Sequence, residues 1–224
     1  MLKAIIFDMD GVLIDSEPVH LESFKRLMDS LSVSFDRDYY LQFIGSTTDY
    51  MWNKVITDYN ISLSKEELMA KSDDFVKEIN GADGYPVMEG AADLIHRLSN
   101  AGIKLAVASS SGMERIESTL DKLGVKELFT GIVSGLQVKN PKPAPDTFLE
   151  AARLLQVMPD ECIVIEDSLN GMKAAKNAGM VCVMYENLSI GTVDSTYADY
   201  IIQGFGELDE NFFEMVYAHI KGEP

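Results

Sequence analysis

The chain of 224 residues is long enough for one well-buried domain with an elaboration or for two small domains, and its apolar share of 46% excludes intrinsic disorder. Its net charge of −17 opposes binding to nucleic acid, because most of the surface would repel the phosphates. No apolar run reaches transmembrane length and no signal peptide precedes the first strand pattern, so we expect a cytoplasmic protein without a membrane partner.

The first predicted strand is residues 2–7, a nearly unbroken apolar run typical of a parallel strand that is buried on both faces. Asp8 and Asp10 follow this strand, and the strand period of two places both on the same side. Ligands of parallel α/β sheets sit beyond the carboxyl ends of the strands, which is where these carboxylates are expected. A plain acidic turn closed by Gly11 is the alternative, and the pair alone does not decide between the two interpretations.

A purely helical stretch comes next. Amphipathic helical patterns cover residues 19–80 without an intervening strand pattern, and Pro18 suits the first turn of the first helix. We therefore expect an α/β core domain formed by residues 1–15 and 87–224, interrupted by an all-helical domain of residues 16–86.

Strand and helix patterns alternate over the rest of the chain. This alternation predicts an α/β fold with a Rossmann-like parallel sheet and helices on both of its faces. The predicted strands are 103–108, 131–134, 162–165, 180–184 and 200–202, and the predicted helices are 90–101, one ending at 122, 144–155, 169–178 and 209–221.

Three serines follow the predicted strand 103–108. Ser109 is placed to offer its hydroxyl to a phosphate oxygen, with Ser110 and the backbone N–H groups of the turn beside it. Ser111, with Glu114 three residues later, matches a capping box, so we expect it to have a structural role.

Lys142 lies in a turn, residues 140–146, that contains three prolines. The prolines stiffen the turn and start a helix without any need for a function. Lys142 is harder to explain, because a cation just before a helix N-terminus opposes the helix dipole and needs solvent or an anionic partner. A lysine held beside carboxylates would be a good counter-ion for a transferring phosphoryl group.

Glu166 and Asp167 follow another predicted strand. Read alone, this pair is explained by helix capping through Asp167 or Ser168. With Asp8 and Asp10, however, it would bring four carboxylates to one rim, which destabilises a fold unless a cation lies among them. Mg²⁺, which prefers oxygen ligands, is the expected cofactor.

The motifs in this order resemble those of the haloacid dehalogenase superfamily. Residues 8–12 are similar to its first motif, Ser109 to the second, Lys142 to the third and Glu166-Asp167 to the fourth. The helical insertion resembles the cap of the subgroup that contains β-phosphoglucomutase and sugar-phosphate phosphatases.

The resemblance implies that Asp8 attacks phosphorus to give an aspartyl-phosphate, and that Asp10 acts as general acid and then as general base. The phosphoryl oxygens would be held by Ser109, Ser110 and Lys142. Mg²⁺ would be bound by Asp8, the main-chain carbonyl of Asp10, and Asp167 with or without Glu166. The cap would exclude bulk water and select the leaving group.

One departure from the resemblance bears on the reaction. β-Phosphoglucomutases carry a cap arginine that grips the distal phosphate of the substrate, and here the stretch 45–49 has Thr48 in its place. His20 and Lys77 match mutase positions, although as surface helical residues they need no special role. Because a guanidinium binds phosphate through two bonds, its loss favours a Mg²⁺-dependent phosphatase acting on a small sugar phosphate, with β-phosphoglucomutase as the alternative.

Two further classes fit less well. A dehalogenase would use Asp8 but would not need Asp10 or the magnesium carboxylates. A phospho-accepting signalling module would share the carboxylates, hydroxyl and lysine, but it would not need a cap. The expected partner is therefore a small phosphorylated molecule, bound by a monomer or weak oligomer.

Overall fold

The computed structural model describes residues 2–43, 48–81, 84–187, 191 and 193–222. The described residues divide into two compact units. The core unit comprises those of 1–15, 87–188 and 192–224, and the helical unit those of 16–86 and 189–191.

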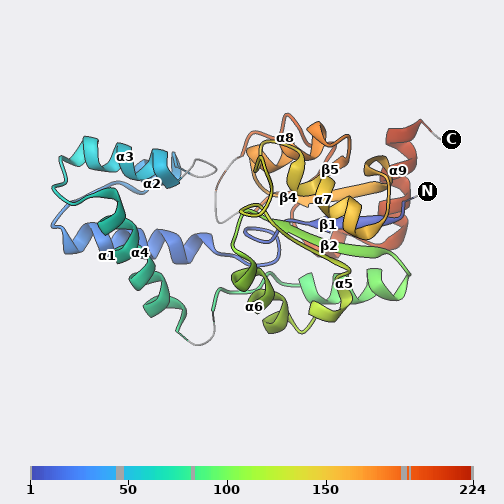
Figure 1. Cartoon of the computed structure of the whole chain (residues 1–224), viewed down its shortest axis with the longest axis horizontal. Helices are drawn as coiled ribbons and strands as arrows, with labels where there is room; N and C mark the ends of the chain where they lie inside the picture. Colours follow the sequence, from blue (N-terminus) through green and yellow to red (C-terminus); the bar gives the residue numbers. More distant parts are fainter. Residues whose placement is uncertain (1, 44–47, 82–83, 188–190, 192, 223–224) are drawn as a thin grey trace. The chain divides into compact units, whose positions relative to one another are not determined.

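The core unit is built on a six-stranded sheet with the order β3-β2-β1-β4-β5-β6, in which every neighbouring pair is parallel (Figure 1). Its strands are β1 (Ala4–Phe7), β2 (Lys104–Ser109), β3 (Gly131–Ser134), β4 (Cys162–Glu166), β5 (Val181–Tyr185) and β6 (Tyr200–Ile202). Its α-helices are α5 (Ala91–Asn100), α6 (Met113–Leu123), α7 (Asp146–Leu155), α8 (Leu169–Asn177) and α9 (Glu210–Lys221). The predicted α/β fold is confirmed.

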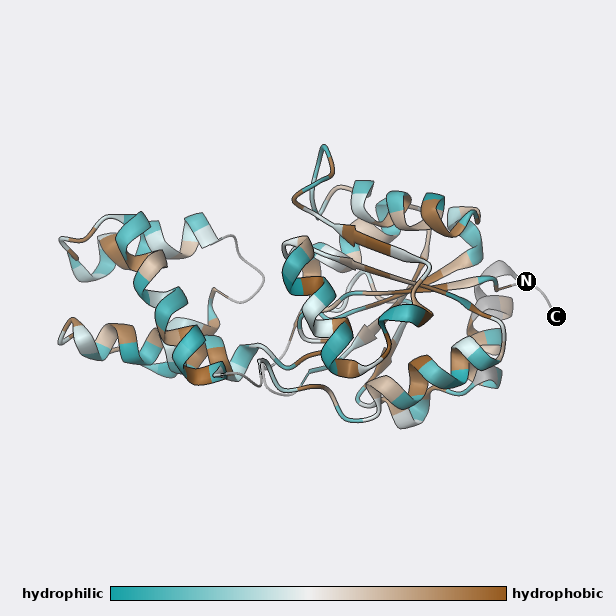
Figure 2. Cartoon of the chain, turned by 60° about the horizontal axis from the view of Figure 1, so that its bottom comes forward, coloured by the Kyte–Doolittle hydropathy of each residue, from teal (hydrophilic) through white to brown (hydrophobic). Residues whose placement is uncertain are grey.

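Both faces of β1 are buried. Ala4 and Ile6 belong to the cluster formed with the apolar sides of α7 and α8, whereas the ring of Phe7 meets the edge of Phe129 with the centroids 6.1 Å apart. Helices cover both sides of the sheet, and the apolar strands lie between their more hydrophilic outer surfaces (Figure 2). An unbroken apolar sequence is therefore what the position of β1 requires.

The start of α7 differs from the prediction by two residues. We expected a helix from Ala144, but α7 begins at Asp146 and Pro145 is its N-cap residue. Ala144 precedes that proline, and the proline ring disfavours helical backbone angles at the residue before it.

The helical unit contains α1 (Glu17–Ser30), α2 (Arg37–Leu41), α3 (Thr48–Tyr59) and α4 (Lys65–Asn80). Phe24 and Trp52 stack at its centre with ring centroids 5.8 Å apart, and both are buried. Ser64 and Glu67 form a capping box at the start of α4. This unit therefore has a hydrophobic core of its own.

None of the helices in the described residues is long and apolar enough to cross a membrane.

The sheet order puts β2, β1 and β4 side by side. Because parallel strands end at the same edge, the residues after Val107, Phe7 and Ile165 are brought together there. This edge carries the polar side chains that follow each of the three strands.

Candidate active site

Lys142 lies at the centre of this edge. Its Nζ donates to Asp8 Oδ1 at 2.5 Å, to Glu166 Oε1 at 2.9 Å and to the Ala108 carbonyl at 3.0 Å. Only 6% of the Lys142 side chain is exposed, and both carboxylates are buried. Three strand ends are thus joined by one buried ammonium group.

The turn after β3 positions this lysine. Asn140 donates from its backbone N–H and its side chain to Asp146 Oδ1, at 3.2 and 3.0 Å, which closes the turn at the start of α7. The Lys142 ammonium also lies 4.6 Å from the ring centroid of the buried Phe148. Asp8 and Glu166 are thus the anionic partners that Lys142 needs because it lies just before the N-terminus of α7.

Glu166 is held by local donors as well as by the lysine. Its Oε2 accepts bonds from the backbone N–H groups of Asp167 and Ser168, at 2.8 and 2.7 Å, and from the Ser168 hydroxyl at 2.9 Å. Ser168 Oγ in turn accepts from the Gly171 N–H at 3.1 Å and caps α8. Of the two capping candidates, Ser168 has that role, and Asp167 joins the carboxylate cluster.

Asp8, Glu166 and Asp167 form this cluster, with one carboxylate oxygen of each within 4.8 Å of the others. Burial raises the pKa of Asp8 to about 7, with Lys142 opposing the rise and Glu166 adding to it. Burial and the charges of Glu166 and Asp8 raise the pKa of Asp167 well above its ordinary range. Burial would lower the pKa of Lys142, but the two carboxylates that it contacts raise it, so it stays charged.

This cluster fits a divalent cation. Three buried carboxylates carry more negative charge than the Lys142 ammonium compensates, and burial, followed by the charge of the neighbouring carboxylates, raises the pKa of Asp8 and of Asp167. Hard cations such as Mg²⁺ take oxygen ligands of this kind. Asp8, Glu166 and Asp167 are the residues that could hold it.

Two glycines make room for the cluster. At Gly11, where φ is +78°, a Cβ atom would lie 1.8 Å from Asp167 Oδ2. At Gly171 a Cβ atom would lie 1.5 Å from Glu166 Oε1. Any side chain at either position would displace a carboxylate, so the close approach of the backbone shapes the site.

Asp10 has different partners from Asp8. Its Oδ2 accepts from the Ser111 hydroxyl at 2.8 Å, and its Oδ1 accepts from Arg115 Nη2. Arg115 Nη1 also donates to Ser111 Oγ at 3.0 Å. The three side chains form a closed triangle at the start of α6, and about a third of Asp10 and of Arg115 is exposed.

The predicted capping role of Ser111 is wrong. The N-cap residue of α6 is Gly112, and no side chain caps this helix. The Ser111 hydroxyl instead binds Asp10, because hydrogen bonds to charged groups are stronger than those to backbone amides. Sequence reasoning also missed Arg115, which lies in the first turn of α6, four residues after Ser111.

The two remaining serines lie at the end of β2. Ser109 is fully buried, and its Oγ accepts from the Ser111 N–H at 3.0 Å. This bond uses a lone pair and keeps the hydroxyl hydrogen for an acceptor such as a phosphate oxygen. Ser110 is exposed at the same strand end. Phosphate binding by either serine stays a prediction.

His20, Thr48 and Lys77 all lie in the helical unit. The His20 ring is 5.5 Å from that of Tyr85, Thr48 is the exposed first residue of α3, and Lys77 is exposed with its Nζ 3.5 Å from Asp74. Residues 45–47 of the stretch that aligns with the mutase arginine lie outside the described residues. The approach of these three side chains to the carboxylate cluster stays a prediction.

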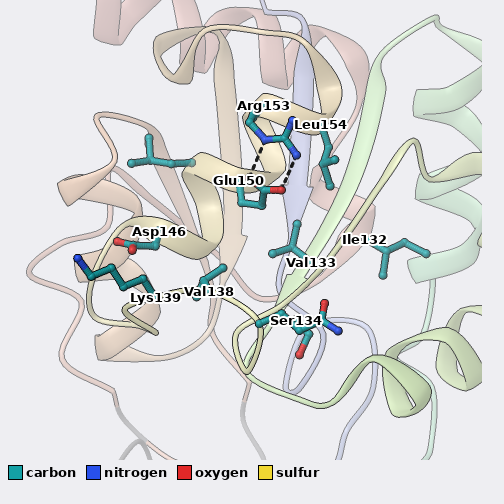
Figure 3. Close-up of a pocket in the computed structure, with 11 residues that line it drawn as sticks. Ile132, Val133, Ser134, Val138, Lys139, Asp146, Glu150, Arg153 and Leu154 are labelled. Carbon is teal, nitrogen blue, oxygen red and sulfur yellow. Dashed lines mark hydrogen bonds and ion pairs between the residues drawn. The ribbon is translucent and has the colours of Figure 1, made fainter.

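A groove of about 710 Å³ elsewhere on the core unit is separate from this site. It runs along β3 and α7, where Arg153 and Glu150 form an ion pair at 2.7 Å (Figure 3). None of the described side chains that line it belongs to the carboxylate cluster. The chemistry is therefore sought at the cluster and not in the groove.

The chain is similar to known proteins over most of its length. The family model for haloacid dehalogenase-like hydrolases matches residues 5–185. The β-phosphoglucomutase of Bacillus subtilis is 31% identical over 188 residues, which are 81% of this chain and 82% of that protein. The phosphorylated carbohydrates phosphatase of Thermotoga maritima is 30% identical over 179 residues, 80% of this chain and 82% of that protein. The crystal structure of a CbbY variant from Rhodobacter sphaeroides in complex with xylulose-(1,5)bisphosphate has a TM-score of 0.74 and 28% identity, covering 93% of this chain and 96% of that one.

The raised pKa of Asp8 predicts how stability depends on pH. Between its ordinary value of 3.8 and its folded value of about 7, the folded protein binds more protons than the unfolded chain. We therefore expect the metal-free protein to lose stability as the pH rises through this range. Since a cation must displace these protons, Mg²⁺ should raise the melting temperature more at about pH 8 than at about pH 5.

Calorimetry at both pH values, with Mg²⁺ or with a chelator, measures this difference. Asp167→Asn removes one carboxylate of the cluster and should flatten the response. A stabilisation by Mg²⁺ of equal size at the two pH values would contradict the prediction.

The close approach at Gly171 predicts the effect of a methyl group there. In a helix, alanine is normally more stable than glycine by about 1 kcal/mol, but at this position it would push Glu166 out of the cluster. We expect Gly171→Ala to weaken the stabilisation by Mg²⁺ and to lower activity. Gly206→Ala is the matched control, because no atom lies within 4 Å of a Cβ atom built there. A wild-type response to Mg²⁺ in Gly171→Ala would show that Glu166 tolerates displacement.

Proposed function

The chain belongs to the haloacid dehalogenase-like hydrolases, and from this membership we propose that it is a Mg²⁺-dependent phosphatase that hydrolyses a small sugar phosphate. The observation that carries the proposal is the buried Lys142 ammonium, which joins Asp8 to Glu166 beside Asp167. A cation fixed next to a carboxylate can bind the oxygens of a phosphoryl group while the carboxylate attacks phosphorus.

The proposed reaction has two steps. First, an Asp8 carboxylate oxygen bonds to phosphorus as the bond to the leaving oxygen breaks, and Asp10, which enters this step in its protonated form, gives that oxygen its proton. Then Asp10 takes a proton from the attacking water, whose oxygen bonds to phosphorus as the Asp8–phosphorus bond breaks. Inorganic phosphate is released, and both carboxyl groups return to their starting forms.

The ligands proposed for the phosphoryl group are Lys142, Ser109 and Ser110. Asp8, the main-chain carbonyl of Asp10, and Asp167 with or without Glu166 would hold Mg²⁺, which would supply positive charge that offsets charge on the phosphoryl group. Lys142 stays charged in its buried position, so it can hold a phosphoryl oxygen throughout.

The helical unit is proposed to act as a cap that excludes water, with core and cap boundaries at residues 15–16 and 86–87. It has a hydrophobic core of its own, as a domain that moves as one body requires. His20 and Lys77 are proposed to contact the sugar part of the substrate. These assignments rest on the family resemblance of the two positions.

Hydrolysis is favoured over intramolecular transfer because of Thr48. The names of the similar proteins include both a phosphatase of phosphorylated carbohydrates and a β-phosphoglucomutase, which makes sugar phosphates the substrate class to test. A mutase must hold a second phosphate while the sugar turns round. The threonine hydroxyl at the start of α3 lacks the charge and the paired donors that a guanidinium offers for this task.

A panel of sugar phosphates tests the proposed reaction. The protein is incubated with β-glucose 1-phosphate and other small sugar phosphates in Mg²⁺, with and without chelator, and both free phosphate and glucose 6-phosphate are followed. We expect phosphate release that the chelator abolishes. Rapid formation of glucose 6-phosphate with little free phosphate would instead identify a mutase, and absence of both products from every substrate would contradict the proposal.

Substitution of the two aspartates separates their roles. Asp8→Asn removes the nucleophile and should abolish turnover. Asp10→Asn should still accept a phosphoryl group on Asp8, but overall turnover should fall about 100-fold or more, as expected for loss of an acid–base group. Intact mass spectrometry detects the phosphoryl group, and Asp93→Asn, an exposed residue of α5, serves as the control. Near-normal turnover of Asp8→Asn would exclude the covalent mechanism.

A further inference from the structure

We infer that Arg115, together with Ser111, is a positioning residue that aims the Asp10 carboxylate at the leaving group and then at the attacking water. The inference rests on the proposed function, in which Asp10 transfers the proton in both steps. Arg115, a residue of α6 that is not part of the carboxylate cluster, would thus have a role in the reaction.

The contacts of Arg115 fix the direction of Asp10. One guanidinium nitrogen donates to Asp10 Oδ1 and the other to Ser111 Oγ, while Ser111 donates to Asp10 Oδ2. Both oxygens of the carboxylate thus accept a hydrogen bond, so rotation about its side-chain bonds would break two hydrogen bonds. A guanidinium suits this task, because its donors lie in a fixed plane.

The serine is itself anchored. Ser134, at the end of β3, donates from its hydroxyl to the Ser111 carbonyl at 2.7 Å, and the Ser111 N–H donates to Ser109 Oγ. The triangle is therefore attached to the ends of β2 and β3 as well as to α6. All of these residues belong to the core unit.

Charge placement supports a specific role. Arg115 is the third residue of α6, where the helix dipole disfavours a cation. Asp10 compensates this cost, but the pair is about one third exposed, and ion pairs of this exposure contribute little to the stability of a fold. Orientation of the carboxylate is the effect that remains.

The side chain of Asp10 is not part of the cation site. The cluster that could hold a metal contains Asp8, Glu166 and Asp167, but not the Asp10 side chain. A carboxylate that neither coordinates the metal nor contacts Lys142 needs another group to fix its position. Arg115 and Ser111 provide hydrogen bonds that do so.

Two aryl phosphates of nearly the same shape test the inference. The bond to p-nitrophenol breaks with little help from an acid, whereas the bond to phenol needs a proton, so the ratio of kcat/KM for p-nitrophenyl phosphate to that for phenyl phosphate reports on the acid. In Arg115→Met we expect this ratio to rise roughly 10-fold, since acid–base groups contribute 10²-fold or more to rates. Asp10→Asn should raise it further.

The second step gives an independent readout. With p-nitrophenyl phosphate, Arg115→Met should form the aspartyl-phosphate quickly. It should hydrolyse this intermediate slowly, because Asp10 must also take a proton from the attacking water. A burst of p-nitrophenol and accumulation of the phosphorylated protein, seen by intact mass spectrometry, are the expected results. A purely structural role of Arg115 would slow both steps alike.

Three variants serve as controls and as a safeguard. Arg153→Met makes the same chemical change at the exposed ion pair beside the groove and should leave the substrate ratio at the wild-type value (Figure 3). Arg115→Lys, whose ammonium cannot hold both acceptors in one plane, should be intermediate. Ser111→Ala removes one bond to Asp10 and tests the same role if Arg115→Met fails to fold.

The outcomes distinguish failure of the positioning role from failure of the proposed function. If the wild-type protein turns over the aryl phosphates and Arg115→Met loses kcat/KM equally for both of them, the positioning role alone is overturned. A gain of activity in that variant would also overturn it, because Arg115 would then restrain Asp10 away from the reaction. Absence of wild-type turnover on aryl and sugar phosphates in Mg²⁺ would overturn the proposed function as well.

Discussion

Burial of several like charges at one sheet edge is the constraint on which the site depends. Asp8, Glu166 and Asp167 are shielded from water, and the described ammonium that contacts this cluster is that of Lys142. Such an arrangement is costly when one partner is missing, since an unpaired buried charge destabilises a fold by several kcal/mol. The sheet order, the closed turn before α7 and the cap of α8 are each needed to keep the opposite charges in contact.

The two aspartates that follow β1 are separated by chemistry although they are neighbours in sequence. Asp8 is buried against an ammonium group, whereas Asp10 is part-exposed and binds a guanidinium and a hydroxyl from α6. A nucleophile must face phosphorus, and a general acid and base must face the leaving oxygen and the attacking water. Different partners on either side of one short turn give each carboxylate a direction of its own.

Much of this architecture could be predicted from the sequence. The apolar run of β1 has no alternation because both faces are buried, and Lys142 carried a charge that its helix position could not explain. The pattern from Ser111 to Glu114 predicted a capping box that does not form, because the Ser111 hydroxyl donates to Asp10, 101 residues away. Arg115 was missed for the same reason: its partner is defined by β2 lying beside β1. Contacts between the two units depend on domain placement, which periodicity does not encode.

The position of β1 at the middle of the sheet has a consequence for how the chain is synthesised. Ala4 pairs with Lys104 on one side and with Cys162 on the other, so the most apolar strand is made long before its neighbours exist. The helical unit has its own core within residues 16–86 and can fold while β1 is still unpaired. Pairing between strands that are far apart in the sequence slows folding, and it leaves the apolar strand β1 exposed while the chain is being synthesised. The strand that delivers the proposed nucleophile is therefore also an apolar segment that stays unpaired until β2 and β4 have been synthesised.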